Sequence, residues 1–441
     1  MRHSRVRSWV AAENLEVEAP ETVEKVDGEV PAETVESTIV EIDKVDRDIE
    51  ALIDDGDQIE QDITDLEELS SVAEDSVEEG GMDESAARIA EVAAEAYCSK
   101  WGVKRQKIAT ENFGLHNRLD STRIAVESLD VAAEGLADTF VDWAKEMKNK
   151  IGKKWSELMT FAGKFKTRVA RLREKFNATG ELATGDIMVK EDLLINGKVD
   201  VAKMGKNVAN LGAGLTKSAN EVKKIYDNYG KFLVAGLNKD GEETITAASQ
   251  RITDSLANMF AMPFSESNKV SDWSRFFSGG MPNDAKNAHA YDVGSNYVFA
   301  FYTVDDVPKF AYSTNTNTNE KEWKTAIPNK SQLDGVIKNL ETFAGSIENG
   351  LKAAMQAGGA DTLAKLEEAF AAAKEGKAAA KSAEYENKAD KKEAMAGANK
   401  AVKQARGAIT VQEQATFATQ RVIQRQAMAL ATFVEGCLKT A

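Results

Sequence analysis

The sequence is poor in the residues that build disulfide frameworks and metal sites. Its 441 residues contain 2 cysteines and 3 histidines. Cys98 and Cys437 lie far apart without neighbouring ligands, so neither a disulfide framework nor a zinc site is indicated, and a reducing compartment is the default. His3, His116 and His289 show no ligand spacing. We therefore expect no metal and no cofactor.

Proline and long apolar runs are also scarce. Proline costs roughly 3 kcal/mol inside a helix, so a chain with 6 prolines and abundant Ala, Glu and Lys is predicted to form long helices. No window approaches the roughly 18 apolar residues of a membrane span. The basic N-terminus is not followed by the apolar run of a secretory signal. The sequence predicts a mainly helical protein that is soluble at synthesis, with 42% hydrophobic residues to build a core.

Charge is distributed unevenly along the chain. Residues 1–99 contain 7 Lys+Arg and 30 Asp+Glu, which gives 7 − 30 = −23. The remaining residues contain 49 basic and 42 acidic side chains, or 49 − 42 = +7, and the two sums return the total of −16. The sign reverses across residues 109–129. Such a division indicates an N-terminal region with a role separable from that of the body.

Residues 1–111 are predicted to form this acidic, propeptide-like region. Its start is predicted to be disordered, because residues 13–37 are mostly Val, Glu, Pro and Thr with little that can pack. A heptad helix is predicted over residues 38–69, interrupted at Gly56. The apolar positions of this heptad seam follow steps of three and four: Ile42, Val45, Ile49, Leu52, Ile59, Ile63 and Leu66.

The heptad seam permits two interpretations. It can mediate self-association or docking on a partner helix, or it can be the apolar face of a helix that packs on its own core.

A linker is predicted at residues 70–81 and a further helix at 83–101. Residues 112–260 are then predicted to form a long-helix domain whose first helix extends to about Phe176. Side-chain oxygens available to cap the start of that helix belong to Asp120, Ser121 and Thr122.

The second half of that helix, residues 143–176, is strongly basic. It holds 11 Lys+Arg against 3 Glu between residues 145 and 175, a net of 11 − 3 = +8, with Trp and Phe interleaved. A basic amphipathic helix can contact phosphate backbones, an anionic membrane or an acidic protein segment; the simpler alternative is a solvated face with aromatic residues in the core. The acidic region is an intramolecular competitor for this basic stretch, defined here as Lys145, Lys148, Lys150, Lys153, Lys154, Lys164, Lys166, Arg168, Arg171, Arg173 and Lys175.

The rest of the chain contains two segments that are predicted to form strands, followed by a helical region. Short strands are predicted around a turn at Asn196-Gly197. Residues 261–330 are predicted to be a small aromatic, β-containing region, because YVFAFYTVDDVPKFAYST places Asp305-Asp306 between two aromatic runs, as in a hairpin. Residues 331–441 are predicted to be an Ala-rich helical region that ends in a helix over 412–438. The predicted fold class is mainly α, with long helices and one small antiparallel β insertion near residues 290–328.

Catalytic motifs are weak. Gly212-Ala213-Gly214 followed by Lys217-Ser218 lacks the adjacent Gly-Lys of a phosphate-binding loop. Neither cysteine has an identifiable histidine partner, and carboxylate pairs carry little information in a chain with 72 acidic residues. We therefore predict no enzymatic activity. The remaining enzyme hypothesis is a site assembled from scattered residues around the aromatic sheet.

Several segments together resemble the internal head proteins of phiKZ-like jumbo tailed phages: ENFG, RLDSTRIAVESL, WAKEMKNKIGKKWSELMTFAGKF and the aromatic segment. The resemblance implies a virion protein made as a precursor, whose N-terminal propeptide is cut by the phage prohead protease after Glu in a Ser/Ala/Gly-x-Glu tripeptide. Ala109-Thr110-Glu111 fits this pattern, with Asn112 as the new N-terminus. Thirteen tripeptides match; Glu111 is favoured by its position at the charge reversal in a predicted turn. Ala93-Ala94-Glu95 is second, inside a predicted helix.

The resemblance further implies assembly in the host cytoplasm, residence in the capsid interior, and contacts with capsid or scaffold proteins. Before cleavage the acidic region would neutralise the basic stretch. The product from Asn112 has 45 basic and 41 acidic residues, or 45 − 41 = +4, so it can associate with packaged double-stranded DNA without sequence preference. The competing hypothesis is a coiled-coil adaptor that binds anionic membranes through the basic Trp-containing helix.

Overall fold

The structure is a computed structural model of the 441-residue chain. It describes residues 33–77, 80–104, 118–189, 191–195, 198–235, 241–261, 264, 270–275, 277, 280–295, 297–314, 323–358, 360–382 and 388–438. Of the predicted disordered segment, residues 13–32 lie outside these ranges, whereas residues 33–37 are helical, so the prediction is wrong there. Among the described residues, no helix is long and apolar enough to cross a membrane.

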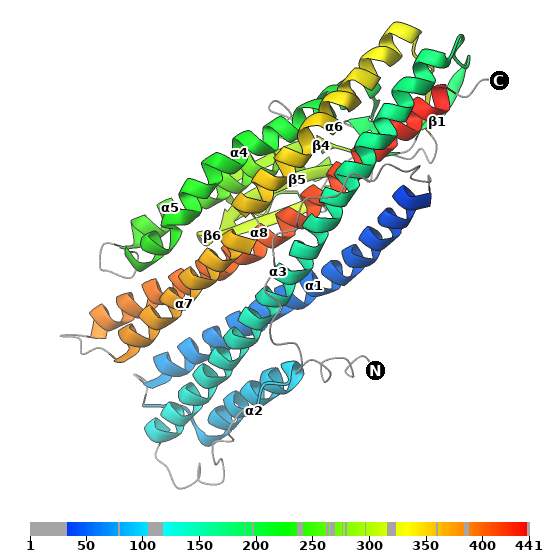
Figure 1. Ribbon diagram of the computed structural model, residues 1–441. Helices are drawn as coiled ribbons and strands as arrows, with labels where there is room; N and C mark the ends of the chain where they lie inside the picture. Colours follow the sequence, from blue (N-terminus) through cyan, green and yellow to red (C-terminus); the bar gives the residue numbers. More distant parts are fainter. Residues whose placement is uncertain are drawn as a thin grey trace. The chain divides into compact units, whose positions relative to one another are not determined.

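Long helices dominate the chain (Figure 1). The α-helices are α1 Glu33–Ser76, α2 Glu84–Trp101, α3 Arg118–Ala178, α4 Val201–Ala235, α5 Gly241–Leu256, α6 Lys330–Gly358, α7 Ala360–Ser382 and α8 Lys388–Cys437. The short 3-10 helices are η4 Glu191–Leu193 and η6 Trp273–Arg275, and η5 Ala257–Ala261 is a π-helix. The strands are β1 Asp186–Val189, β2 Leu194–Ile195, β3 Lys198–Val199, β4 Lys286–Gly294, β5 Tyr297–Val304, β6 Val307–Thr314 and β7 Trp323–Ala326. The predicted mainly α fold class is confirmed.

The chain divides into two compact units. The first contains Asp55–Trp143, and therefore the C-terminal part of α1, all of α2 and the start of α3. The second contains Val35–Asp54 and Ala144–Ala441. The predicted domain boundaries at residues 111, 260 and 330 stay predictions.

In the first unit, polar contacts join α1 to α2. Asp62 is buried and accepts hydrogen bonds from Lys100 Nζ at 2.6 Å and Trp101 Nε1 at 2.7 Å. One turn further along α1, Asp65 accepts the Tyr97 hydroxyl at 3.0 Å. Because residue numbers rise on α1 as they fall on α2, the two helices run antiparallel.

The heptad seam of α1 is largely buried within its own chain. Ile59, Ile63 and Leu66 are at most 2% exposed in the first unit. A Cβ on Gly56 would overlap the Trp143 ring, so the residue that interrupts the seam makes room for an aromatic side chain. The burial of these residues supports the second interpretation of the seam, in which the helix packs on the core of its own chain.

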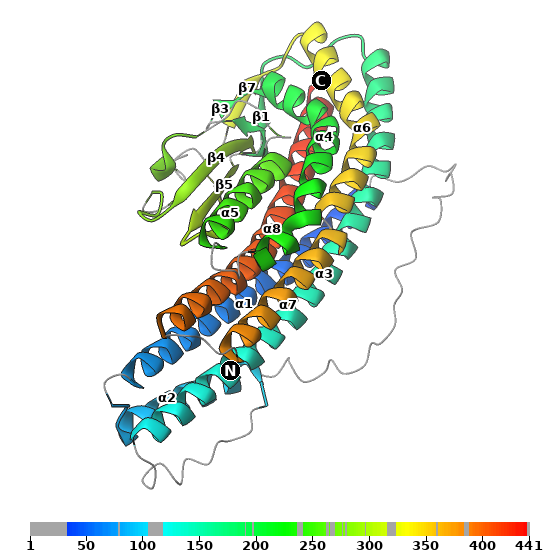
Figure 2. The same ribbon diagram turned by 90° about the vertical axis from the view of Figure 1, so that its left-hand side faces the viewer.

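In the second unit, α4 and α6 lie side by side (Figures 1 and 2). Gly212 and Gly350 lie where these helices cross, and a Cβ on Gly212 would sit 2.6 Å from the Ser346 carbonyl carbon. A Cβ on Gly350 would likewise sit 2.7 Å from the Gly212 Cα. The glycines that superficially suggested a phosphate-binding loop therefore allow two helix backbones to touch.

Three small antiparallel sheets accompany the helices in the described residues. The largest is β4-β5-β6, whose β5–β6 hairpin turns at Asp305 and Asp306, both at positive φ of 51° and 61°. These are the angles of a type I′ turn, which matches the twist of a two-residue hairpin. The sheet packs against α5 and α8 (Figure 2). Phe299 is fully buried and contacts Phe310 edge-on at 5.5 Å.

Several local predictions are corrected. The helix α1 continues through residues 70–76, which were predicted to be linker. α3 begins at Arg118, and Thr122 Oγ1 accepts the Met82 backbone N–H instead of capping the helix. The short strands predicted around Asn196-Gly197 are confirmed as β2 and β3, whereas the separate sheet that β1 forms with the distant β7 was not predicted. The last helix begins at Lys388, far before residue 412.

Candidate functional site

The predicted cleavage site, Ala109, Thr110, Glu111 and Asn112, lies outside the described residues. It falls in the connection between α2, which ends at Trp101, and α3, which begins at Arg118. The α2 end is well formed: Gly102 adopts φ of 71°, and its N–H reaches the last carbonyls of the helix. The site is therefore bracketed by two helices whose termini are defined.

The basic stretch lies wholly on α3, and its aromatic neighbours face the core. Trp155, Phe161 and Phe165 are at most 1% exposed. Lys154 is fully buried beside Trp155, and its ammonium lies 5.0 Å from the centre of the Phe417 ring of α8. This lysine cannot reach an external phosphate, so one of the 11 predicted DNA contacts is a core residue.

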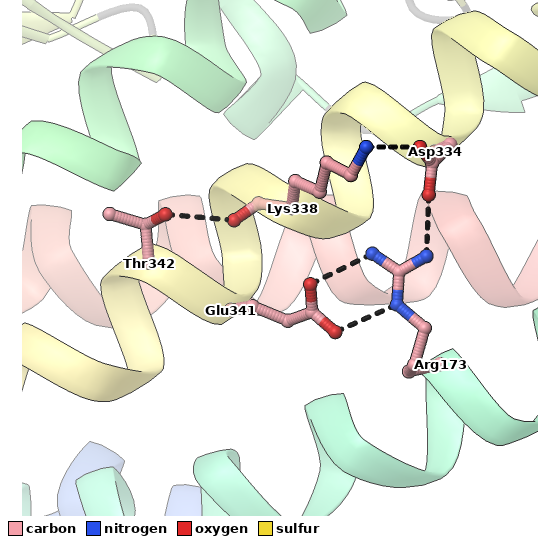
Figure 3. Close-up of polar contacts among 5 residues, drawn as sticks. All are labelled: Arg173, Asp334, Lys338, Glu341 and Thr342. Carbon is pink, nitrogen blue, oxygen red and sulfur yellow. Dashed lines mark hydrogen bonds and ion pairs between the residues drawn. The ribbon is translucent and has the colours of Figure 1, made fainter.

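Two arginines of the stretch bind carboxylates of the C-terminal helices. Arg173 donates from Nε and Nη2 to Glu341 at 2.7 and 2.8 Å, and from Nη1 to Asp334 at 2.5 Å, both on α6 (Figure 3). Arg168 makes a similar two-pronged contact with Glu435 of α8 at 3.0 and 2.7 Å. Such paired bonds are geometrically specific, which identifies both arginines as structural clamps.

The contacts of Arg173 shift the pKa values of the side chains that take part in them. The Lys338 ammonium and the Arg173 guanidinium lower the pKa of Asp334 through hydrogen bonds, and Arg173 lowers the pKa of Glu341 in the same way. Hydrogen bonds that Arg173 donates to Glu341 and Asp334 raise its pKa against the opposing effect of burial. The cluster is therefore fully ionised near neutral pH.

Two lysines of the stretch meet acidic side chains at longer distances. Lys150 Nζ lies 3.1 Å from Asp48 of α1, a contact within the second unit between the acidic region and the basic stretch. Lys148 Nζ lies 3.9 Å from Glu367 of α7. Both lysines are partly exposed, so these pairs contribute little to stability.

The remaining basic residues include a line along one helix face. Lys153, Lys164, Arg171 and Lys175 follow steps of 11, 7 and 4 residues, which return to nearly the same direction at 100° per residue. We call this set the cation stripe. Lys164 is half-buried and the other three are exposed. The stripe spans about 33 Å at 1.5 Å per residue, whereas Lys145 and Lys166, also exposed, point elsewhere.

Sequence reasoning found the basic residues but missed their acceptors. Asp334, Glu341 and Glu435 follow their arginine partners by 161, 168 and 267 residues. Acidic residues are too common in this chain for composition to select these three. Helix periodicity could have signalled that Lys154 shares the buried side of α3 with Trp155 and Leu158.

Two further features bear on function. Among the described residues, no group of three or more His, Cys, Asp or Glu side chains is placed to hold a metal ion. His289 Nε2 lies 2.9 Å from Asp254 Oδ1, and its ring stacks on Tyr291. His289 is thus bound to its own fold beside the aromatic sheet.

Comparison with known proteins gives a match that spans most of the chain. The family model of phiKZ-like phage internal head proteins matches residues 37–436. The match begins within α1 and therefore includes the acidic helices as well as the basic stretch and the sheets. No curated protein and no solved structure matches. With this coverage, the chain belongs to the phiKZ-like phage internal head proteins, which are structural proteins of the capsid interior.

Proposed function

We propose that the chain is synthesised as a precursor and that a prohead protease cuts it after Glu111 during head maturation. The observation that carries this proposal is the position of the charge reversal, which begins in the connection between α2 and α3. A cut there leaves both helices intact. It divides the chain into residues 1–111, at 11 − 31 = −20, and a product at 45 − 41 = +4.

Two of the competing tripeptides lie inside helices. Ala94 of the Ala93-Ala94-Glu95 tripeptide is fully buried in α2, and Ala132 of Ala132-Ala133-Glu134 is fully buried in α3. A protease binds its substrate in an extended form, so either cut requires local unfolding of a packed helix. This favours Glu111 over both alternatives.

Cleavage by itself does not detach the acidic region. Asp62 and Asp65 of α1 bind α2, and Ser70 of α1 donates a hydrogen bond to Asp130 of α3 at 2.8 Å. Ser128 of α3 also donates to the buried Glu91 of α2. Loss of the acidic charge therefore needs separation or further digestion of α1 and α2 after the cut.

We further propose that the cation stripe contacts packaged DNA in the matured particle. Four cations along about 33 Å match roughly one turn of B-DNA, where phosphates line the groove edges. Glu157 lies near the same face, so the stripe binds through phosphate contacts of modest strength. The binding is independent of base sequence, because affinity comes from released counterions.

The test is salt-dependent binding of a labelled duplex by fluorescence anisotropy. The variant changes Lys153, Lys164, Arg171 and Lys175 to Gln; the matched control removes four exposed charges elsewhere in the same unit, Lys145, Lys166, Lys198 and Lys324. Each phosphate contact contributes about 0.9 to the slope of log K against log salt. We expect the stripe variant to lose about three to four units of slope and the control to lose less than one. Equal losses would contradict the proposed stripe.

The membrane-adaptor hypothesis loses its principal support. Trp143 and Trp155 were the aromatic residues expected to enter a lipid interface, and they are 6% and 1% exposed. A helix that binds membranes places its large apolar side chains outward. The geometry of α3 does the reverse.

A further inference from the structure

In α2 the small apolar side chains are buried and the large ones are exposed, which reverses the usual arrangement. The residues that it buries are small: Ala87, Ala90, Ala94 and Cys98, together with Glu91. Its large apolar residues face outward, since Ile89 is 70% and Val92 is 64% exposed. A surface helix normally buries its β-branched side chains. The outward face of α2 therefore has the character of an interface.

The outward residues follow a heptad. Ser85, Ile89, Val92, Ala96 and Ser99 are separated by 4, 3, 4 and 3 residues, and all five are exposed. This spacing keeps one stripe facing a partner helix over the whole length of α2. It is a second heptad, separate from the buried heptad seam of α1.

One flank of this stripe carries charges of opposite sign at two positions, so it is complementary to the same flank of a second, reversed copy. Arg88 and Glu95 each precede a core position, Ile89 and Ala96 respectively, and lie symmetrically about the middle of α2. They are seven residues apart, about 10 Å along the helix, so they do not pair within one copy. Arg88 instead contacts Glu84 at 2.9 Å in an exposed pair, which is easily exchanged.

We propose that α2 pairs antiparallel with α2 of a second copy of this chain. About a two-fold axis near the middle of the helix, Ile89 of each copy packs against Val92 of the other, and Arg88 of each copy lies beside Glu95 of the other. Such an interface has two-fold symmetry, so each copy contributes the same surface and no third copy is added. This inference does not depend on cleavage or on DNA binding.

A parallel arrangement of the two α2 helices would pair fewer charged side chains. It would set Glu95 beside Lys100 of the second copy and Arg88 beside Ala93, following the usual flanking pairs of parallel coiled coils. Lys100 is already held by the buried Asp62 at 2.6 Å. Only the antiparallel pair uses Arg88 and Glu95 together, and it does so twice.

α1 carries two further exposed apolar side chains. Leu69 and Val72 are 40% and 66% exposed. The antiparallel contacts Asp62–Trp101 and Asp65–Tyr97 bring these positions level with the middle of α2. A single pair of α2 helices forms a small interface, so the dimer is expected to be weak, on the order of ten micromolar.

The test is sedimentation velocity of the full chain between about 1 and 200 μM, a range chosen to span the expected constant. The variants are Ile89→Glu, Arg88→Glu, Glu95→Arg and the double exchange Arg88→Glu with Glu95→Arg. Val131→Glu is the matched control, because Val131 is a 44% exposed residue of α3 in the same unit. Circular dichroism checks that each variant retains its helices.

We expect dimers for the wild type and the Val131→Glu control. Ile89→Glu should weaken association at least about thirtyfold, because it sets two charges in the centre of the interface. Each single charge reversal should weaken it roughly tenfold, since two attractive pairs become repulsive. The double exchange should restore it. A monomeric wild type, a dimer insensitive to Ile89→Glu, or a double exchange as weak as the single reversals would overturn the proposal.

Discussion

The contact between α4 and α6 makes a quantitative prediction for Gly212→Ala. At an open helix position, Gly→Ala stabilises by about 1 kcal/mol, because glycine loses more backbone entropy on folding. At residue 212 the added Cβ would lie 2.6 Å from the Ser346 carbonyl carbon. Since that neighbour is backbone, the whole helix must move to relieve the overlap.

The magnitude follows from two opposing terms. Overpacking of a tight contact costs about 1–3 kcal/mol, and the gain in helix propensity is about 1 kcal/mol. We expect a net destabilisation of up to about 2 kcal/mol for Gly212→Ala. The matched control is Gly152→Ala on α3, where a Cβ meets nothing within 4 Å. The control should gain up to about 1 kcal/mol.

Thermal unfolding followed by circular dichroism at 222 nm measures the difference. In a unit of this size, 1 kcal/mol corresponds to about 2 °C in Tm. Gly212→Ala should therefore lower Tm by up to about 4 °C while Gly152→Ala raises it slightly. If both substitutions raised Tm equally, the close approach of α4 and α6 at Gly212 would be wrong.

Two further predictions rest on titratable groups. Asp334 and Glu341 have lowered pKa values in the fold, so their stabilising contribution is present above the ordinary carboxyl pKa and is lost as pH falls through the lowered values. Arg173→Met should therefore lower Tm at pH 7, and its deficit relative to the wild type should shrink towards pH 3; a deficit that is constant with pH would contradict the role of the cluster. Burial raises the pKa of Cys437 to about 11, and Cys98 is 2% exposed. A thiol reagent at pH 8 should consequently modify neither cysteine quickly in the folded chain and both after denaturation, whereas rapid reaction of the native protein would refute the packing of α8 around Cys437.

The periodic elements could be predicted from the sequence. Few prolines and steps of three and four identified α1, α2 and α3, because helix periodicity is a local property of the chain. The Asp305-Asp306 hairpin was likewise visible, since two aromatic runs flank two residues that tolerate positive φ. The pairing of β1 with β7 was not visible. Their partners, such as Val189 and Trp323, are distant in sequence, and each strand has only 4 residues.

The candidate site was predicted in part for the same reason. Composition located the basic stretch, but it could not assign directions to its side chains. Lys154 proved to be a core residue, and Arg168 and Arg173 hold α8 and α6. These contacts join residues far apart in sequence. The cation stripe proposed to contact DNA is identified by periodicity only once the buried side of α3 is known.

The outward Ile89 and Val92 of α2 illustrate a different limit. A heptad in sequence does not show whether its stripe faces the core or a partner. In α1 the apolar stripe is buried, and in α2 a comparable stripe is exposed. Only the packing of Ala87, Ala90 and Ala94 against the unit distinguishes the two cases.

The proposed maturation is tested most directly by the intact mass and N-terminal sequence of the protein recovered from mature virions, compared with the protein from infected cells before head maturation. We predict a chain that starts at Asn112 in virions and the uncut chain only in the earlier sample. A virion protein that still begins at Met1 or Arg2 would contradict precursor processing. A chain cut at another Ser/Ala/Gly-x-Glu tripeptide would contradict the assignment of Glu111.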